Sequence, residues 1–142
     1  LKSCLIREVA YWGTYEDINK MRSYITADNT LYRSAAIQCM GIAKFAYAEQ
    51  ALEQAYSQQT EELKEQTLYT ILRIRSGKAL PFYVGAYGES TVATTKYAIL
   101  MCMYWYNEES RETFELLESS ADEDDLLLFK EVRASLVDPM LE

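Results

Sequence analysis

Apolar residues recur every three or four positions along almost the whole chain, and no stretch shows the strict alternation typical of a β-strand. The first apolar segment ends at Gly13, and its helically spaced residues are Leu5, Ile6, Val9, Ala10 and Trp12. Thr14 and Asp17 then form the pattern of a capping box, in which each side chain serves a free backbone amide. The pattern predicts further helices at about 15–26, 30–45, 47–58, 61–76, 78–88, 91–106, 108–120 and 124–138. The expected fold class is therefore all-α.

The predicted helices recur in pairs. Residues 28–52 contain a polar cap, a helix rich in small residues, a short break and a second helix that begins with small residues. A similar order follows about 31 residues later at 63–83 and, more weakly, at 91–114. One helix pair per period predicts an α-solenoid, in which each pair buries its apolar face against the next. We expect one domain over 1–138, with repeats at about 1–27, 28–59, 60–88 and 90–121 and a terminal helix at 124–138.

The most regular repeat carries a specific motif around Arg33. Its residues are Asp28, Leu31, Tyr32, Arg33, Ala35, Ala36, Cys39, Met40, Gly41, Ala48 and Leu52. This motif resembles a HEAT repeat of the phycobilisome-lyase-like kind. The second copy keeps an Ala-x-Pro element ending at Pro81 but has Glu65 where the arginine belongs, and the third copy keeps only the apolar frame. The resemblance implies a right-handed superhelix of about four antiparallel helix pairs, used as an interaction scaffold, with the second helices lining a concave surface.

The charge of the chain is concentrated near one end. The net charge is −8, and residues 108–131 contain ten acidic residues against Arg111 and Lys130. The rest of the chain is neutral, so it lacks the large basic surface that a nucleic-acid-binding protein needs. The acidic segment is either a solvated helix face or a site for a basic partner.

The positions of the cysteines and the length of the apolar runs indicate the cellular compartment of the protein. Cys4, Cys39 and Cys102 are far apart in apolar helical patterns, which argues against disulfides and for a reducing, cytoplasmic location. The longest apolar run, 97–106, is about half as long as a bilayer span requires, so we expect no membrane insertion of this segment. The chain starts at Leu1 without methionine, and in the tail 139–142 Leu141-Glu142 resembles the residues left before a purification tag. We therefore expect a piece of a longer protein.

Residue types exclude most catalytic chemistry. The chain has no histidine, which removes the usual nucleophile–base arrangements and histidine-containing zinc sites. The cysteines lack the C-x-x-C spacing of a zinc site, and no glycine-rich phosphate loop occurs. Asp122–Asp125 lacks the ligand spacing of a calcium loop. We therefore expect a protein without enzymatic activity, cofactor or metal.

The expected function is a protein or peptide interaction scaffold. The candidate partner-binding residues lie on second helices and fall outside the apolar pattern: Glu49, Gln50, Glu53, Gln54, Lys78 and Phe82. Arg73 and Arg75 form a small basic cluster with Lys78, which either balances a helix dipole or contacts an anion or acidic peptide. Two alternatives remain open. One is a homo-oligomerising cytoplasmic domain of a membrane-anchored protein, and the other is an enzyme or lyase-type subunit.

Overall fold

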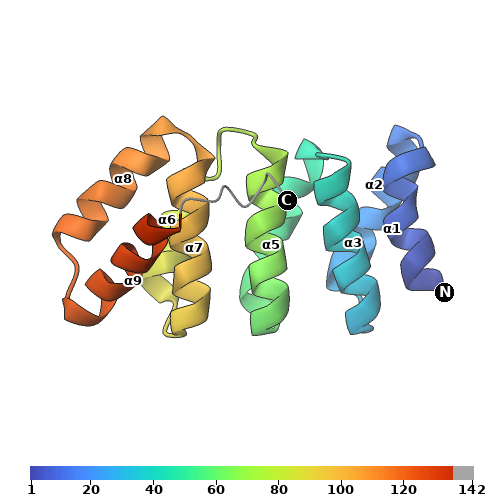
Figure 1. Cartoon of the computed structure of the whole chain (residues 1–142). Coiled ribbons are helices and arrows are strands. Elements are labelled where there is room, and N and C mark those ends of the chain that lie inside the picture. The colour runs from blue at the N-terminus through green and yellow to red at the C-terminus, as the bar shows by residue number, and fades with distance from the viewer. Residues whose placement is uncertain (136–142) are drawn as a thin grey trace. The chain divides into compact units, whose positions relative to one another are not determined.

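The computed structural model describes residues 1–135, which form helices and contain no β-strand (Figure 1). The predicted all-α class is confirmed. The α-helices are α1 (Lys2–Trp12), α2 (Tyr15–Met21), α3 (Thr30–Ile42), α4 (Glu49–Ala55), α5 (Glu61–Ile74), α6 (Leu80–Glu89), α7 (Ala93–Tyr106), α8 (Glu108–Ser119) and α9 (Glu123–Ala134). Three 3-10 segments are η1 (Arg22–Thr26), η2 (Ala46–Ala48) and η3 (Tyr56–Gln58). None of these described helices combines the length and the apolar character needed to cross a bilayer.

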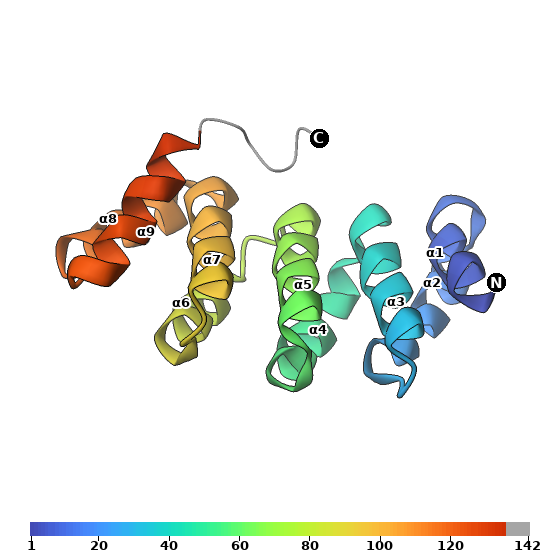
Figure 2. The same ribbon diagram turned by 60° about the horizontal axis from the view of Figure 1, so that its bottom comes forward.

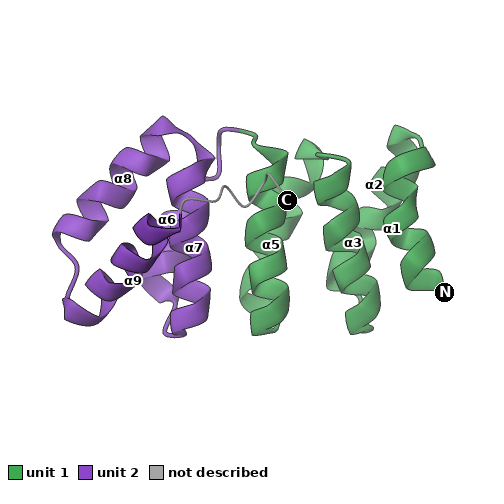
Figure 3. Ribbon diagram, in the orientation of Figure 1, with its two compact units in different colours: residues 1–76 green, residues 77–142 purple. Residues whose placement is uncertain are grey.

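The chain divides into two compact units, residues 1–76 and residues 77–142 (Figure 3). The division falls between Ser76 and Gly77, inside the predicted repeat 60–88. The expectation of one repeat domain over 1–138 stays a prediction.

Unit 1 (residues 1–76) is built on a row of three helices. Helices α1, α3 and α5 lie side by side, with α3 in the middle (Figure 1 and Figure 2). The α2–η1 segment packs on α1 and α3, and α4 packs on η1 and α5. The α2–η1 segment therefore contacts its own first helix and the next pair, whereas α4 contacts the pairs before and after its own.

Helix α3 owes its central place to small residues. Six of its residues are buried: Ala35, Ala36, Ile37, Cys39, Met40 and Gly41. A Cβ atom added to Gly41 would lie 3.2 Å from Oγ1 and 3.3 Å from Cγ2 of Thr70 in α5, so α3 and α5 meet closely at this point. The Thr70 hydroxyl in turn donates a hydrogen bond to the Ile37 carbonyl (3.3 Å), which satisfies a buried polar group at the contact.

Arg33, on which the HEAT resemblance centred, joins successive helix pairs. Its Nε donates to the Ala27 carbonyl after η1, and its Nη1 donates to Gln59 Oε1 (3.2 Å) ahead of α5. Gln59 is itself buried and donates from Nε2 to the Ile25 carbonyl (3.2 Å). The Arg33 guanidinium and the Gln59 amide therefore satisfy two backbone carbonyls at the end of the first pair, from the starts of the two pairs that follow.

Unit 2 is described over residues 77–135 and is centred on α7. The helix contacts α6, α8 and α9, and its all-apolar run is buried, as predicted: Ala98, Ile99, Leu100, Met101, Cys102 and Met103. Phe114 of α8 and Phe129 of α9 are fully buried with ring centroids 4.8 Å apart, and Phe114 also lies 5.4 Å from Tyr104. These edge-to-face contacts join the last two helices to α7.

The predicted helix ends are confirmed where polar caps were visible in the sequence. Thr14 and Asp17 form the expected capping box, and Asn107 forms one with Ser110 at the start of α8. Pro81 lies in the first turn of α6, where its missing N–H leaves no helical bond unmade.

Other predicted boundaries differ from the structure. The helices predicted at 15–26 and 47–58 are each a short α-helix joined to 3-10 turns. The helix predicted at 61–76 ends at Ile74, because Arg75 adopts a left-handed conformation (φ 50°) that stops the helix before Gly77 is reached. The helix predicted at 124–138 is observed as Glu123–Ala134, and the predicted tail at 139–142 lies outside the described residues.

Helix α1 has both buried and exposed apolar residues. Ile6 and Val9 are buried, but Leu5 and Trp12 are 53% and 64% exposed. The apolar residues of α1 therefore occupy two faces, and only one of them packs on unit 1.

Replacing Gly41 with valine should destabilise the protein by about 1–3 kcal/mol, because the added methyl groups have no space between α3 and Thr70. Gly85 is the matched control, since a Cβ added there meets nothing within 4 Å. Gly85→Ala should stabilise α6 by about 0.5–1 kcal/mol. Urea unfolding measures both, and a neutral Gly41→Val variant would contradict the close contact.

Candidate functional site

The second-helix side of unit 1 contains a groove of about 720 Å³ between α2–η1 and α4. Its lining residues are Asn19, Lys20, Met21, Arg22, Ser23, Tyr24, Ile25, Thr26 and Ala51. The 3-10 winding of η1 shapes one wall, and the small side chain of Ala51 leaves room at the other. The groove thus has both apolar surface and side chains that form hydrogen bonds.

Two of the predicted residues lie on α4, the helix that contributes Ala51 to this groove. Gln50 and Gln54 are exposed on α4, one residue before and three residues after Ala51. Their amides can donate and accept hydrogen bonds, which suits contact with a peptide backbone. The structure therefore places Gln50 and Gln54 on the same helix as the groove wall.

An aromatic cluster that the sequence analysis missed lies at the junctions between paired helices. Tyr15 and Tyr47 are 56% and 69% exposed, and their ring centroids are 5.7 Å apart in an edge-to-face arrangement. Both rings pack on the buried Phe45. Arg22 of the groove donates from Nη1 to the Tyr47 carbonyl (3.3 Å), which links the cluster to the groove. The high tyrosine content was the available signal, but spacing alone does not show which tyrosines meet.

The prediction that Glu49 lies on the surface is wrong. Its side chain is only 8% exposed, and its two carboxylate oxygens accept hydrogen bonds from Ser76 Oγ at 2.8 and 2.6 Å. Ser76 follows α5, so this contact fixes the end of α5 against α4. Any contact of Glu49 with a partner would first require the loss of this hydrogen-bonded position.

Glu53 lies one turn after Glu49 and is half-buried. Burial, followed by the charge of Glu49, raises the pKa of Glu53 from its ordinary value of 4.5 to about 7. This carboxyl group therefore changes its charge near neutral pH.

The predicted basic cluster is divided between the two units. Arg73 and Arg75 are exposed near the end of α5 in unit 1, whereas Lys78 belongs to unit 2. Arg73 lines a second groove of about 490 Å³ between α3 and α5, together with Glu62 and Glu65. This mixed charge does not favour an anion, and the anion-site interpretation of Arg73 and Arg75 stays a prediction.

Phe82 is less exposed than the sequence pattern indicated. It is half-buried in α6, and its ring centroid lies 5.7 Å from that of Tyr83, which is fully buried. Substitution of Phe82 would therefore change the packing of unit 2 as well as its surface.

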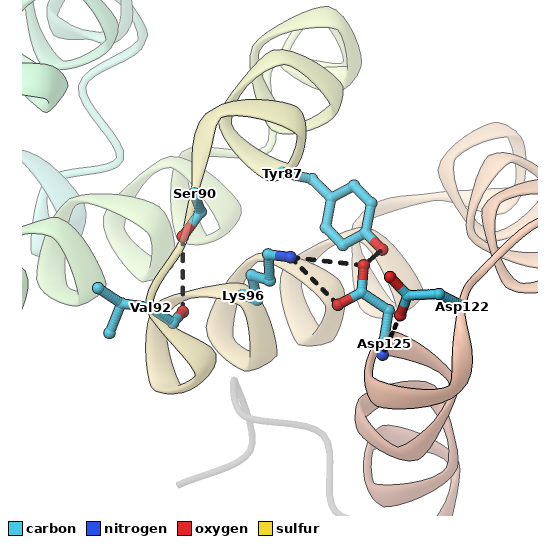
Figure 4. A network of polar contacts seen from close by, with 6 residues as sticks. All are labelled: Tyr87, Ser90, Val92, Lys96, Asp122 and Asp125. Atoms are coloured by element: carbon cyan, nitrogen blue, oxygen red, sulfur yellow. Dashed lines mark hydrogen bonds and ion pairs between the residues drawn. The ribbon is translucent and has the colours of Figure 1, made fainter.

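Unit 2 contains a polar network that joins α6, α7 and α9 (Figure 4). The Tyr87 hydroxyl donates to Asp125 Oδ2 (2.8 Å), and Lys96 Nζ donates to both carboxylate oxygens at 3.1 and 3.4 Å. The Tyr87 hydroxyl and then Lys96 lower the pKa of Asp125. Asp122 caps α9 by accepting from the Asp125 amide (2.8 Å), so two carboxylates of the acidic segment 108–131 have structural roles.

The described residues include no group of three or more side chains placed to hold a metal ion. Cys4 is a free, exposed thiol, and Cys39 and Cys102 are free and buried. Burial raises the pKa of the Cys39 thiol to about 11, so this thiol stays protonated at neutral pH.

No protein-family model matches this chain, and neither the curated proteins nor the solved structures include a match. The HEAT resemblance therefore rests on the residues around Arg33 alone.

The raised pKa of Glu53 predicts a pH-dependent stability difference. The folded protein holds a proton on Glu53 that the unfolded chain releases between pH 4.5 and about 7. The stabilisation of the folded state by this bound proton is therefore fully present below pH 4.5 and is lost as the pH rises through about 7. Relative to wild type, Glu53→Gln should become progressively more stable between pH 5 and pH 8 in urea unfolding. A carboxyl titration of Glu53 by NMR with an ordinary midpoint would contradict this expectation.

Replacing Tyr87 with phenylalanine should cost about 1.5–3 kcal/mol, because Asp125 loses a hydrogen bond to its charged carboxylate. Tyr97→Phe is the control, since the Tyr97 hydroxyl makes no hydrogen bond within residues 1–135. The control should change the free energy of unfolding by less than about 0.5 kcal/mol. Equal effects of the two substitutions would show that the network adds nothing to stability.

Proposed function

We propose that this protein is a HEAT-like α-solenoid scaffold without catalytic activity, and that the second-helix side of unit 1 binds a segment of another protein. The groove between α2–η1 and α4 is the observation that carries the proposal. In paired-helix repeats the second helices form the surface that successive repeats extend, and such surfaces suit elongated ligands. The free thiols fit a cytoplasmic location.

The chemistry of the groove supports a polypeptide ligand. Gln50 and Gln54 offer amides to a peptide backbone, and Tyr15 and Tyr47 offer flat apolar rings with polar ends. Tyrosine provides large contact area at a small entropic cost, which explains its frequency at protein interfaces. The groove itself contains Lys20 and Arg22 as its charged residues, so a segment with some acidic character is the favoured ligand.

A capture experiment with charge-matched variants tests this proposal. Wild type, Gln50→Glu/Gln54→Glu and Thr30→Glu/Leu31→Glu are each immobilised and exposed to native lysate at two salt concentrations. Both variants add two negative charges at exposed positions, but the second variant alters α3, which belongs to the row of α1, α3 and α5. We expect a protein that wild type and the α3 variant retain, and that the α4 variant retains about tenfold less. Equal retention by all three proteins, or loss with the α3 variant alone, would contradict the assignment of the binding side.

A further inference from the structure

Two tyrosine rings of unit 1 form a cage around an ammonium group. Tyr24 belongs to η1 and Tyr32 to α3, and their ring centroids lie 6.0 Å apart with the ring planes at 86°. The ammonium of Lys2, at the start of α1, lies over both rings, 5.0 Å from the centroid of Tyr24 and 5.1 Å from that of Tyr32. At these distances the quadrupole of an aromatic ring attracts a cation. The cage therefore has a cation seated against two ring faces.

The backbone beside both rings is fixed by buried and hydrogen-bonded residues. Ile25 follows the first tyrosine and is buried, and its carbonyl accepts a hydrogen bond from Gln59 Nε2 (3.2 Å). Arg33 follows the second tyrosine, and its Nε donates to the Ala27 carbonyl between the two rings in the sequence. The segment that presents the rings is therefore held in place before any ligand arrives, which lowers the cost of binding.

The present occupant of the cage is held by the rings without help from oxygen atoms. Lys2 is exposed, and its ammonium has no hydrogen-bond acceptor or carboxylate within residues 1–135. By contrast, Lys96 of unit 2 lies over a tyrosine ring and also donates to Asp125 (3.1 Å). Because a cation–ring contact at an exposed site is weak, Lys2 can exchange between the cage and water.

A methylated ammonium suits such a cage better than a lysine side chain does. Methyl groups lower the cost of removing the positive charge from water, and they add apolar contact with the rings. Two ring faces at nearly right angles contact a roughly spherical group from two sides. The ring faces carry negative partial charge, so they disfavour a phosphate or a carboxylate.

We propose that Tyr24 and Tyr32 form a binding site for a methylated ammonium group, and that Lys2 occupies this site when no ligand is bound. On binding, the Lys2 ammonium moves into water while α1 stays packed through Ile6 and Val9. Lys2 is therefore an internal competitor that lowers the apparent affinity for the ligand. The first tyrosine also lines the groove beside α4, but the cage and its cation are defined without that groove. The proposal does not depend on the scaffold function.

Titration of the whole chain with choline chloride at constant ionic strength, followed by NMR, tests the site. Ring currents shift the ε-methylene protons of Lys2, and this shift should disappear as choline displaces the ammonium. We expect a dissociation constant on the order of 1–10 mM. The matched probe is 3,3-dimethyl-1-butanol, which has the shape of choline without its charge and should bind about tenfold more weakly. Equal binding of the two compounds, or an unchanged Lys2 signal, would overturn the proposal.

Substitutions in the cage separate its two parts. Lys2→Ala should bind choline about fivefold more tightly than wild type, because the competitor is removed. Tyr24→Leu and Tyr32→Leu should each weaken binding about tenfold, since leucine fills space but has no aromatic face. The control Tyr11→Leu alters an exposed tyrosine of α1 outside the cage and should bind like wild type. Circular dichroism identifies the variants that stay folded. Wild-type affinity in a folded cage variant would overturn the site, and unchanged affinity in Lys2→Ala would overturn the competition.

A second set of probes identifies the source of the methylated ammonium. A short peptide with trimethyllysine presents the group on a polypeptide, and phosphatidylcholine vesicles present it on a lipid surface. Binding of either probe that is lost with Tyr32→Leu supports the site and shows which source it accepts. The control is the same peptide with unmethylated lysine, which should bind at least fivefold more weakly. Equal binding of the two peptides would overturn the preference for a methylated group.

Discussion

Helix α3 packs between α1 and α5, and Gly41 allows α5 to approach it at Thr70. Close packing of this kind requires small residues at the contact, and α3 supplies them with Ala35, Ala36 and Gly41. The arrangement of unit 1 follows from this contact. With three helices in a row, the second helices must pack across the row to bury their own apolar faces, as α4 does against η1 and α5. The groove beside α4 and the uncovered face of α1 are both consequences of that row.

The two units use different means to hold their helices together. In unit 1 the side chains of Arg33 and Gln59 donate to backbone carbonyls after and within η1 and to each other between successive pairs. In unit 2 a carboxylate, Asp125, is bound by Tyr87 and Lys96, and aromatic rings from α8 and α9 fill the core. The net charge of the chain, −8, equals the net charge of residues 108–131 in unit 2. The binding that we propose for unit 1 would therefore depend on shape, hydrogen bonds and local charges more than on the net charge.

The sequence predicted the helices well because their apolar spacing and polar caps are local features. Thr14 with Asp17 and the long apolar run of α7 identified their elements without any tertiary information. The left-handed Arg75 was not predictable, because such a conformation usually requires glycine and Gly77 stood close by. For α1 the helical spacing could not show which of the apolar residues pack, and Ile6 and Val9 are buried whereas Leu5 and Trp12 are exposed.

The candidate site was only partly predictable from the sequence, because part of it depends on contacts between residues that are far apart in the chain. Gln50 and Gln54 were correctly placed on the surface, since polar residues outside an apolar stripe are usually exposed. The burial of Glu49 depends on Ser76, which lies 27 residues further along the chain, and no local pattern reveals that pairing. The groove itself depends on the path of η1, whose 3-10 winding has no clear signature in the sequence.

Amide hydrogen exchange of the protein alone tests most directly whether α3 is the structural centre of unit 1. Burial on both sides predicts that the amides of α3 exchange most slowly in this unit, near the rate of global unfolding. The amides of η1 and α4, which border the open groove, should exchange faster. If α3 exchanged as fast as η1, helix packing around α3 would not be the constraint that organises the unit.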